Sequence, residues 1–228
     1  MFKPTDLFDL DQSEHVAIFE GCAFAWEALT KIRTYVQDNL RPALCNRCEG
    51  VAYIGKQVFI GEGTIVEDGA MIKGPAIIGR NCQIRHNAYI REDVIVGDNC
   101  VLGNSCEFKN VLLFNNCQVP HFSYVGDSIL GYKAHLGAGV KISNVKLVPG
   151  NVMVEMDGKP FDTGLRKFGA LLSDNTDIGC NSVLNPGSII GRGSVIYPNT
   201  SWRGILPPNH IAKNQAPVEV VVRRARSS

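Results

Sequence analysis

The segment from Val119 to Asp127 holds the residues best suited to chemistry in this chain. It contains His121 and, three positions later, Tyr124. An imidazole with an ordinary pKa near 6.5 is mostly neutral at physiological pH, so His121 could accept a proton as a general base. A single histidine in a repeat protein is more often a surface or packing residue. The segment alone therefore leaves both interpretations open.

The second candidate is the pair Cys45 and Cys48, whose spacing is that of half a zinc site or of a redox pair. No second CxxC or CxxH follows to complete four ligands, so we expect no metal there. The eight cysteines are too sparse and irregular for a secreted disulfide scaffold. We expect them to be free thiols.

A hexapeptide repeat occupies most of the chain and must position these residues. Large apolar residues recur every six positions, at Ile54, Ile60, Val66, Ile72, Ile78, Ile84, Ile90, Val96, Leu102, Phe108 and Phe114. A small or β-branched residue such as Cys82, Cys100 or Cys106 follows four positions after each. This period is typical of a parallel β-helix, in which each hexad makes one short strand and one corner and three hexads close a coil. The pattern therefore predicts an all-β fold, with the large residues and the small cysteines inside.

The repeat falters between residues 114 and 144, through Val119, Val125, Leu130, Leu136 and Ile142, and then returns at Leu172, Ile178, Leu184, Ile190 and Ile196. Residues 144–169 interrupt it and contain an alternating run that leads into Asp157-Gly158, which predicts a hairpin. Insertions in solenoids collect on one face, which often binds ligands. About twenty hexads predict six or seven coils, on the order of 30 Å tall.

The two ends of the chain differ from the repeat. From Glu14 to Leu40 apolar residues fall three or four apart, and Asp11 with Glu14 has capping-box spacing, which predicts an amphipathic helix. The predicted organisation is a helical N-terminal segment at 1–50, a β-helix at 51–206 and a tail at 207–228. The tail contains a strand-like run at 218–222, followed by Arg223, Arg224 and Arg226, and we expect it to leave the prism.

The charge balance argues against polyanionic partners. There are 23 Lys and Arg residues against 22 Asp and Glu, which leaves no basic field to hold nucleic acid or a membrane surface. No long apolar run or signal-peptide pattern is present. We therefore expect a soluble, cytoplasmic protein.

The run from His121 to Asp127, followed by Leu136-Gly-Ala-Gly139 and Asn144, resembles a known family of hexapeptide-repeat acyltransferases. It resembles the acetyltransferase domain of the bifunctional enzyme that makes UDP-N-acetylglucosamine. It is also similar to the carboxy-terminal half of archaeal sugar-1-phosphate nucleotidylyltransferases, which carry a segment comparable to Thr163–Lys167. The resemblance implies a left-handed β-helix, a homotrimer, and acetyl transfer from acetyl-CoA to an amino-sugar phosphate such as glucosamine-1-phosphate, without a metal.

The resemblance also implies roles for individual residues. His121 would be the general base that takes the proton of the sugar amine. Arg91 and Lys109 fall at the family's spacing for the cations that hold the sugar's phosphate. Tyr124 and Lys167 match a sugar-binding tyrosine and lysine.

Further matches concern the coenzyme and the sugar's identity. Ala138 matches a backbone position that contacts acetyl-CoA and helps to stabilise the oxyanion. Asn144 matches a substrate-binding residue. His135 stands where the bacterial enzyme has a sugar-contacting Asn, and Cys180 stands where it has a Ser near the coenzyme. The chain holds no Gly-rich nucleotide loop, so the nucleotidyl transfer of the relatives is expected to be absent.

Two alternatives remain open at this stage. A γ-type carbonic anhydrase shares the fold and binds zinc through three histidines, and the separation of His86 and His121 is close to that family's. The third ligand expected shortly after His121 is missing, since Gly126 and its neighbours cannot bind zinc. The other alternative is a non-catalytic module that binds sugar nucleotides or serves in assembly.

Overall fold

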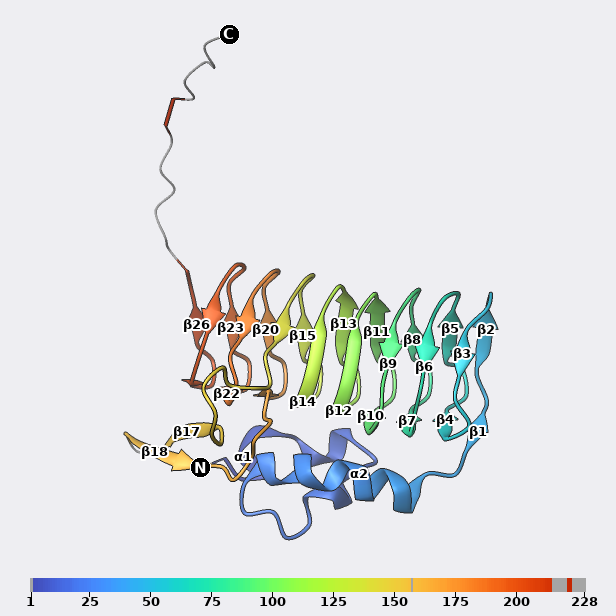
Figure 1. Cartoon of the computed structure of the whole chain (residues 1–228), viewed down its shortest axis with the longest axis horizontal. Coiled ribbons are helices and arrows are strands. Elements are labelled where there is room, and N and C mark those ends of the chain that lie inside the picture. The colour runs from blue at the N-terminus through green and yellow to red at the C-terminus, as the bar shows by residue number, and fades with distance from the viewer. Residues whose placement is uncertain (1, 157, 215–220, 223–228) are drawn as a thin grey trace.

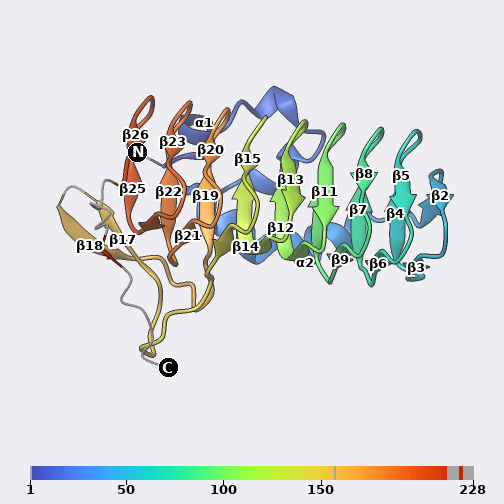
Figure 2. The ribbon, with the colours of Figure 1, turned by 90° about the horizontal axis from the view of Figure 1, so that it is seen from above.

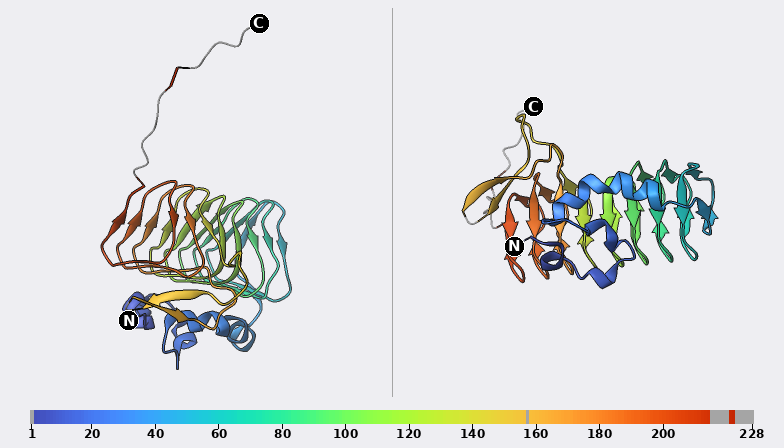
Figure 3. Two further views of the ribbon diagram at one scale, coloured as in Figure 1. Left: turned by 60° about the vertical axis from the view of Figure 1, so that its left-hand side comes forward. Right: turned by 90° about the horizontal axis from the view of Figure 1, so that it is seen from below.

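The computed structural model describes residues 2–156, 158–214 and 221–222. Between Ala43 and Ala212 the chain winds into a left-handed parallel β-helix with three strand-bearing faces, as Figures 1 and 3 show. The predicted fold is therefore confirmed. We name the faces first, second and third in the order in which the chain visits them after Leu44.

The first face is a nine-stranded parallel sheet. Its strands are β2 (Arg47–Glu49), β5 (Ile65–Glu67), β8 (Gln83–Ile84), β11 (Val101–Asn104), β13 (Gln118–His121), β15 (His135–Leu136), β20 (Asp177–Ile178), β23 (Val195–Ile196) and β26 (Ile211–Ala212). The prism therefore has nine turns rather than the predicted six or seven. At the usual strand spacing it is about 40 Å tall, whereas the predicted height was about 30 Å.

The second and third faces join into one fifteen-stranded sheet. The second face contains β3 (Tyr53–Ile54), β6 (Met71–Ile72), β9 (Tyr89–Ile90), β16 (Lys141–Ile142), β21 (Val183–Leu184) and β24 (Ser201–Trp202). The third contains β1 (Ala43–Leu44), β4 (Val58–Ile60), β7 (Ala76–Ile78), β10 (Val94–Val96), β19 (Ala170–Leu172), β22 (Ser188–Ile190) and β25 (Ile205–Leu206). The long strands β12 (Glu107–Leu113) and β14 (Tyr124–Leu130) run through both faces.

The boundaries of the β-helix are wider than predicted. Strand β1 pairs with β4 and β2 pairs with β5, so the solenoid begins at Ala43 rather than at residue 51. Strand β26 pairs with β23, so it extends past residue 206 into the predicted tail. Residues 218–220 of the predicted strand-like run, with Arg223, Arg224 and Arg226, lie outside the described residues.

The interior is built as the repeat predicts, with one exception. The large repeat residues from Ile60 to Ile196 and the small cysteines Cys82, Cys100 and Cys106 are buried in one cluster. Phe114 is the exception, because Leu113 fills the interior while Phe114 packs outside against Phe8, with ring centroids 5.1 Å apart. All eight cysteines are free thiols, as expected.

Asparagines make many of the corners. A corner requires a positive φ, which asparagine tolerates better than most residues other than glycine. The asparagines with positive φ are Asn81, Asn87, Asn99, Asn110, Asn116, Asn175, Asn181, Asn199 and Asn209.

A second hydrophobic core lies outside the prism, on the third face. Each strand there points one apolar side chain outward, next to the interior residue; the stripe consists of Ile77, Ile95, Leu112, Ile129, Leu171 and Ile189. The N-terminal segment covers this stripe with Phe8, Phe19, Trp26 and Ile32. Figure 3 shows the N-terminal helices lying along the underside of the prism. The third face is thus occupied, which leaves the first and second faces for ligands.

The helix predicted for residues 14–40 is shorter than expected. Helix α2 spans Ala28–Asn39 and is preceded by α1 (Pro4–Leu7) and by three short 3-10 turns, η1 (Leu10–Gln12), η2 (Val16–Phe19) and η3 (Ala25–Glu27). Gly21, with φ 71°, breaks the helical path after η2. The capping-box prediction for Asp11 and Glu14 is also wrong, since the carboxylate of Glu27 accepts the free amides of Ala23 and Phe24 instead.

Histidine 15 links the N-terminal turns to α2 and gives this segment a dependence on pH. Its Nδ1 lies 3.2 Å from the hydroxyl of Tyr35, and the two rings meet edge to face. Burial lowers the pKa of His15 below its ordinary value of 6.5. The unfolded state therefore binds more protons below about pH 6.5, so the stability that His15 contributes is present above that pH and is lost as pH falls.

We therefore expect the parent protein to lose more thermal stability between pH 7.5 and 5 than His15→Gln, which lacks the titrating ring. Thermal melts of both proteins at the two pH values measure the difference. Equal losses would show that protonation of His15 does not weaken the attachment of the segment.

The excursion at residues 144–169 forms the predicted hairpin. Strands β17 (Met153–Met156) and β18 (Lys159–Asp162) pair in antiparallel fashion. Figures 1 and 2 show the hairpin beside the last coils, at the C-terminal end of the prism. Its residues Val152 and Val154 join the outer core with Trp26 and Phe168, so the loop is packed against the N-terminal segment. Within the described residues, no helix is both long and apolar enough to pass through a membrane.

Candidate active site

Three of the predicted site residues stack in one column at the corner between the first and second faces. His121 ends β13, Ala138 follows β15, and Cys180 follows β20 in the next coil. The ladder places them in register, because the amide of Gly139 donates to the oxygen of His121 and that of Asn181 donates to the oxygen of Ala138, at 3.0 and 2.8 Å. Neighbouring members are thus one strand spacing apart, about 4.8 Å.

The glycine before Ala138 keeps this column tight. A Cβ on Gly137 would lie 3.0 Å from Cys180 Sγ and 2.7 Å from its backbone nitrogen, so any side chain there would push the two coils apart. The amide of Ala138 itself donates to no group in the described part of the chain. It is therefore available to a carbonyl oxygen of a ligand at this corner.

The imidazole of His121 is exposed and makes no hydrogen bond within the described residues. Its ring lies beside that of Phe122, at a centroid distance of 6.1 Å. Phe122 is itself 60 % exposed, which is unusual for so large an apolar side chain. The corner thus presents a histidine and a phenylalanine side by side to a ligand or a neighbouring subunit.

A polar cluster lies beside this column, where the second face turns into the third. The amide of Asn144 donates to the hydroxyl of Tyr124 at 3.2 Å and makes a short hydrogen bond to Asp127. Gly126 makes room for it, because a Cβ there would lie 2.6 Å from the Tyr124 hydroxyl and 2.8 Å from the Asn144 amide. Burial raises the pKa of Tyr124, so its phenol is a neutral hydrogen-bonding group at physiological pH.

The two predicted phosphate-binding cations, Arg91 and Lys109, occupy adjacent strands of this face but are already paired. Arg91 contacts Glu107 at 2.9 Å and Glu92 at 3.1 Å. Lys109 Nζ lies 3.3 Å from Asp127 Oδ1. A phosphate at this place would have to share these cations with carboxylates of the same chain.

Asp127 is the central group that sequence reasoning did not assign a role. Its side chain is only 5 % exposed and accepts from Lys109 at 3.3 Å, from Asn110 at 2.9 Å and from Asn144. It thus joins Lys109 and Asn110 of the preceding coil to Asn144 of the following one. The sequence does single out Asp127, because this residue ends the His121–Asp127 motif at a corner where the hexad is one residue short.

We expect Asp127→Asn to destabilise the protein by about 3 kcal/mol, because it leaves Lys109 without its charge partner in a mostly buried site. Urea unfolding of the variant and the parent measures this difference. The matched control is Asp177→Asn, whose carboxylate is 61 % exposed beside His135, and we expect a change within about 0.5 kcal/mol. Equal effects in the two variants would mean that Asp127 is not the organising charge.

The remaining predicted residues are more scattered. His135 lies on the first face, 3.1 Å from Asp177, and so does not face the Tyr124 cluster of its own chain. Lys167 is exposed at the end of the excursion loop, next to Phe168, whose amide donates to the oxygen of Asn144 at 3.0 Å. The structure thus brings the root of the loop, but not His135, to the second face.

The geometry gives little support to a zinc site built from His86. His86 belongs to the same corner column as His121, two coils earlier, but both of its ring nitrogens are engaged, by the oxygen of Asp68 at 2.7 Å and by the amide of Asn87 at 2.9 Å. No group of three or more His, Cys, Asp or Glu side chains placed to hold a metal occurs in the described parts of the chain. Cys45 and Cys48 are exposed on the first coil.

The fold defines the chain as a hexapeptide-repeat β-helix protein, and comparison with known proteins sharpens this class. Residues 72–157 match the family described as the GMPPB C-terminal domain. This range includes the predicted site residues except two; those inside it are Arg91, Lys109, His121, Tyr124, His135, Ala138 and Asn144.

Curated relatives confirm the predicted resemblance. The chain is 36 % identical over 92 residues to a bifunctional sugar-1-phosphate nucleotidylyltransferase/acetyltransferase of Sulfurisphaera tokodaii, a match that covers 40 % of this chain and 23 % of the relative. It is 38 % identical over 93 residues to the bifunctional protein GlmU of Methanococcus maripaludis, covering 41 % and 22 %. The chain thus matches less than a quarter of either relative's length.

Among solved structures, the chain is similar to a UDP-N-acetylglucosamine acyltransferase of Arabidopsis, with a TM-score of 0.42 and 14 % identity. The match covers 74 % of this chain and 67 % of that one.

Proposed function

We propose that the protein transfers the acetyl group of acetyl-CoA to the amine of an amino-sugar phosphate. The observation that carries the proposal is the corner column of His121, Ala138 and Cys180 beside the Tyr124–Asn144–Asp127 cluster. Within the described residues it combines an imidazole without a hydrogen bond, an unpaired backbone donor and the neutral phenol of Tyr124 on the adjoining face. The relative from Sulfurisphaera tokodaii is named in part as an acetyltransferase, which supports the same reaction.

In the proposed reaction the amine nitrogen attacks the thioester carbonyl, and a ring nitrogen of His121 takes the amine proton. The new C–N bond forms as the carbonyl oxygen gains negative charge, which the amide of Ala138 is placed to stabilise. The C–S bond then breaks, and the proton on His121 passes to the leaving sulfur. The products are the N-acetylated sugar and free CoA.

The sugar would lie on the second face, against the residues that the loop root and β14 bring together. Tyr124 and Asn144 offer hydrogen bonds to hydroxyl groups, and Lys167 is near enough in the chain to reach the same ligand. Arg91 and Lys109 remain the proposed phosphate ligands. The phosphate would share them with Glu107 and Asp127.

We further propose a homotrimer that places a second copy against the corner column. A flat prism face gives little concavity, whereas ligand sites bury most of the ligand surface. The exposed His121 and Phe122 are the residues that a neighbouring copy would enclose. His135 of one copy, which lies on the first face, could then reach a ligand on the second face of another.

The test of the proposed function is release of free CoA when the protein is mixed with acetyl-CoA and a panel of amino-sugar phosphates, glucosamine-1-phosphate among them. Matched sugar phosphates that carry a hydroxyl in place of the amine are the controls. We expect thiol release with at least one amino sugar and none with its control. No release with any amino sugar would support a non-catalytic β-helix.

A further inference from the structure

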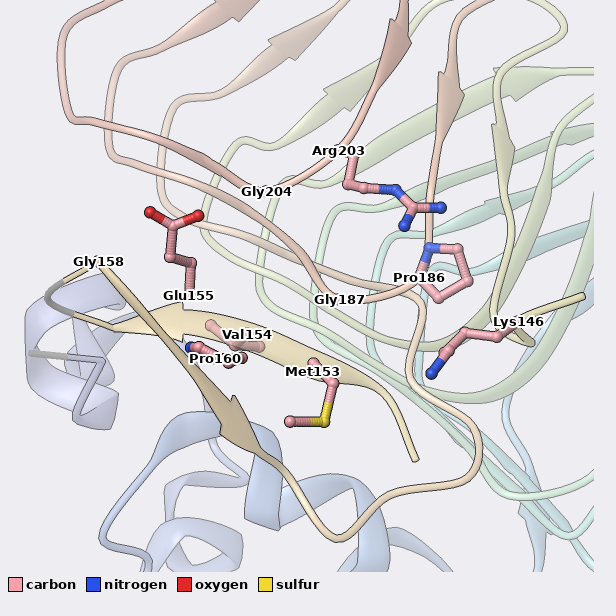
Figure 4. Close-up of a pocket in the computed structure, with 10 residues that line it drawn as sticks. All are labelled: Lys146, Met153, Val154, Glu155, Gly158, Pro160, Pro186, Gly187, Arg203 and Gly204. Atoms are coloured by element: carbon pink, nitrogen blue, oxygen red, sulfur yellow. The ribbon is translucent and has the colours of Figure 1, made fainter. Parts of the chain in front are cut away.

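A pocket of about 370 Å³ lies between the hairpin and the last coils, beyond the proposed acetyl-transfer site along the prism. Its floor is formed where the second face turns into the third, at Pro186-Gly187 and at Arg203-Gly204. Strands β17 and β18 form the opposite wall, as Figure 4 shows. The volume falls within the range of small-molecule sites.

The hairpin is seated closely on this floor. Gly187 permits the approach, because a Cβ there would lie 2.7 Å from Val152 Cγ1 and 3.3 Å from the oxygen of Met153. Val154 is buried in the outer core, so the wall is anchored rather than free. The pocket is therefore formed by the packing of the excursion loop on the prism.

The charges in the pocket are divided between its two ends. Figure 4 shows Arg203 and Lys146 at the same end of the pocket, on either side of Pro186, while the carboxylate of Glu155 lies at the other end near Gly158. Within the described residues Arg203 has no ion-pair or hydrogen-bond partner, and Lys146 donates only to the oxygen of Asn151 at 2.9 Å. Unlike Arg91 and Lys109, these two cations have no carboxylate partner of their own.

Two cations at the same end of one pocket, neither paired with a carboxylate of the described residues, fit a dianionic group, and a phosphate is the common one in small molecules. The Glu155 carboxylate can accept hydrogen bonds from hydroxyl or amino groups at the far end. Between them, Met153, Val154 and Pro186 offer an apolar surface to a ring. This division of charge matches a phosphate ester of a polyhydroxylated molecule.

We propose that this pocket binds a phosphate monoester, such as a sugar phosphate or a nucleoside monophosphate, with its phosphate on Arg203 and Lys146 and its hydroxyl groups toward Glu155. The cationic end of this pocket lies further along the prism than Tyr124, although its floor begins one strand step from Asn144, since Ile142 pairs with Leu184 and Pro186 follows. Three strand steps lie between β14, which carries Tyr124, and β24, which precedes Arg203, a separation of about 14 Å along the prism. The inference does not depend on acetyl transfer.

The experiment is isothermal titration of the whole protein, without acetyl-CoA, with glucosamine-1-phosphate, adenosine monophosphate and inorganic phosphate. We expect saturable binding of at least one ester, and weaker binding of inorganic phosphate, which reaches only the cationic end. Arg203→Gln should lower the ester affinity at least about tenfold, the usual worth of a charge-assisted hydrogen bond. Lys56→Gln, an exposed lysine at the other end of the prism, is the matched control and should bind as the parent does.

A second arm separates this site from the transfer site. Arg91→Gln, which removes a proposed phosphate ligand of the transfer site, should still bind adenosine monophosphate with the affinity of the parent, and bound ester should slow hydrogen exchange of the hairpin amides in 153–162. Three outcomes would overturn the inference: no saturable binding of any probe, equal affinity for the esters and inorganic phosphate, or binding that is lost in Arg91→Gln but kept in Arg203→Gln. The last outcome would place the phosphate on the Arg91–Lys109 side instead.

Discussion

Replacing His121 with alanine is expected to lower kcat for acetyl transfer by about two to four orders of magnitude, the usual contribution of a positioned general base. The imidazole is exposed and makes no hydrogen bond within the described residues, so its removal costs the fold little. We therefore expect KM and the unfolding midpoint to change far less than kcat. Initial rates of CoA release, together with a thermal melt, measure these three quantities.

The chain provides its own control for this variant. His86 occupies the same corner column two coils earlier and is equally a surface histidine, but its two ring nitrogens are engaged by the oxygen of Asp68 in the preceding coil and by the amide of Asn87. His86→Ala should leave kcat within about twofold of the parent, since no reacting group lies beside it. If His121→Ala and His86→Ala have the same rate, His121 is not the base and the proposed reaction needs another proton acceptor.

The second large effect is expected from Trp26→Ala. Trp26 is 1 % exposed and packs against Phe2, Phe24, Phe161 and Phe168, with ring centroids 4.5–6.2 Å apart. It joins the N-terminal segment to both the hairpin and the root of the excursion loop. Truncating such a residue leaves a cavity and costs about 3–5 kcal/mol.

We expect this loss to appear in urea unfolding, and to be accompanied by lower acetyl-transfer activity because Phe168 lies next to Lys167 and bonds to Asn144. Tyr197→Ala, which removes a partly exposed aromatic ring from the first face, is the control and should change stability by about 0.5 kcal/mol or less. A Trp26→Ala variant as stable as the control would show that the N-terminal segment is not part of the cooperative fold.

The interior of the prism was predictable because its rule is local. One large residue every six positions points into the interior from each strand. This prediction is confirmed even in the irregular coils, where the interior residues are Val119, Val125, Leu130, Leu136 and Ile142. The position of the first shortened hexad was predicted wrongly. Leu112, Leu113 and Phe114 are all apolar, so any of them could hold the interior position. Only the packing of Phe114 on Phe8 decides which residue faces out.

The apolar stripe on the third face could have been found from the sequence, but only by looking for a repeat of one whole coil instead of one hexad. Ile77 and Ile95 precede interior residues by one position and stand one full coil apart, so the stripe appears only when every third hexad is compared. The N-terminal segment that covers it was read as one helix, because apolar spacing of three or four also suits successive short turns. The tertiary surface, rather than local propensity, determines its path.

The site was predictable in part. The corner column of His121, Ala138 and Cys180 is a consequence of register, which one coil length fixes once the repeat is known. The motif marks Asp127, but its ion pair with Lys109 and the pair of Arg91 with Glu107 could not be assigned from the sequence, because the partners lie in neighbouring coils next to hexads of changed length. The pocket beneath the hairpin depends on how the loop folds back, which the repeat does not specify.

The most direct test of the proposed site is a crystal structure of the protein with CoA and an amino-sugar phosphate bound. The account predicts that the CoA sulfur lies against the corner between His121 and Ala138, with the amine of the sugar within hydrogen-bonding reach of the imidazole. A coenzyme bound with its sulfur away from this column, or a sugar amine out of reach of His121, would contradict it.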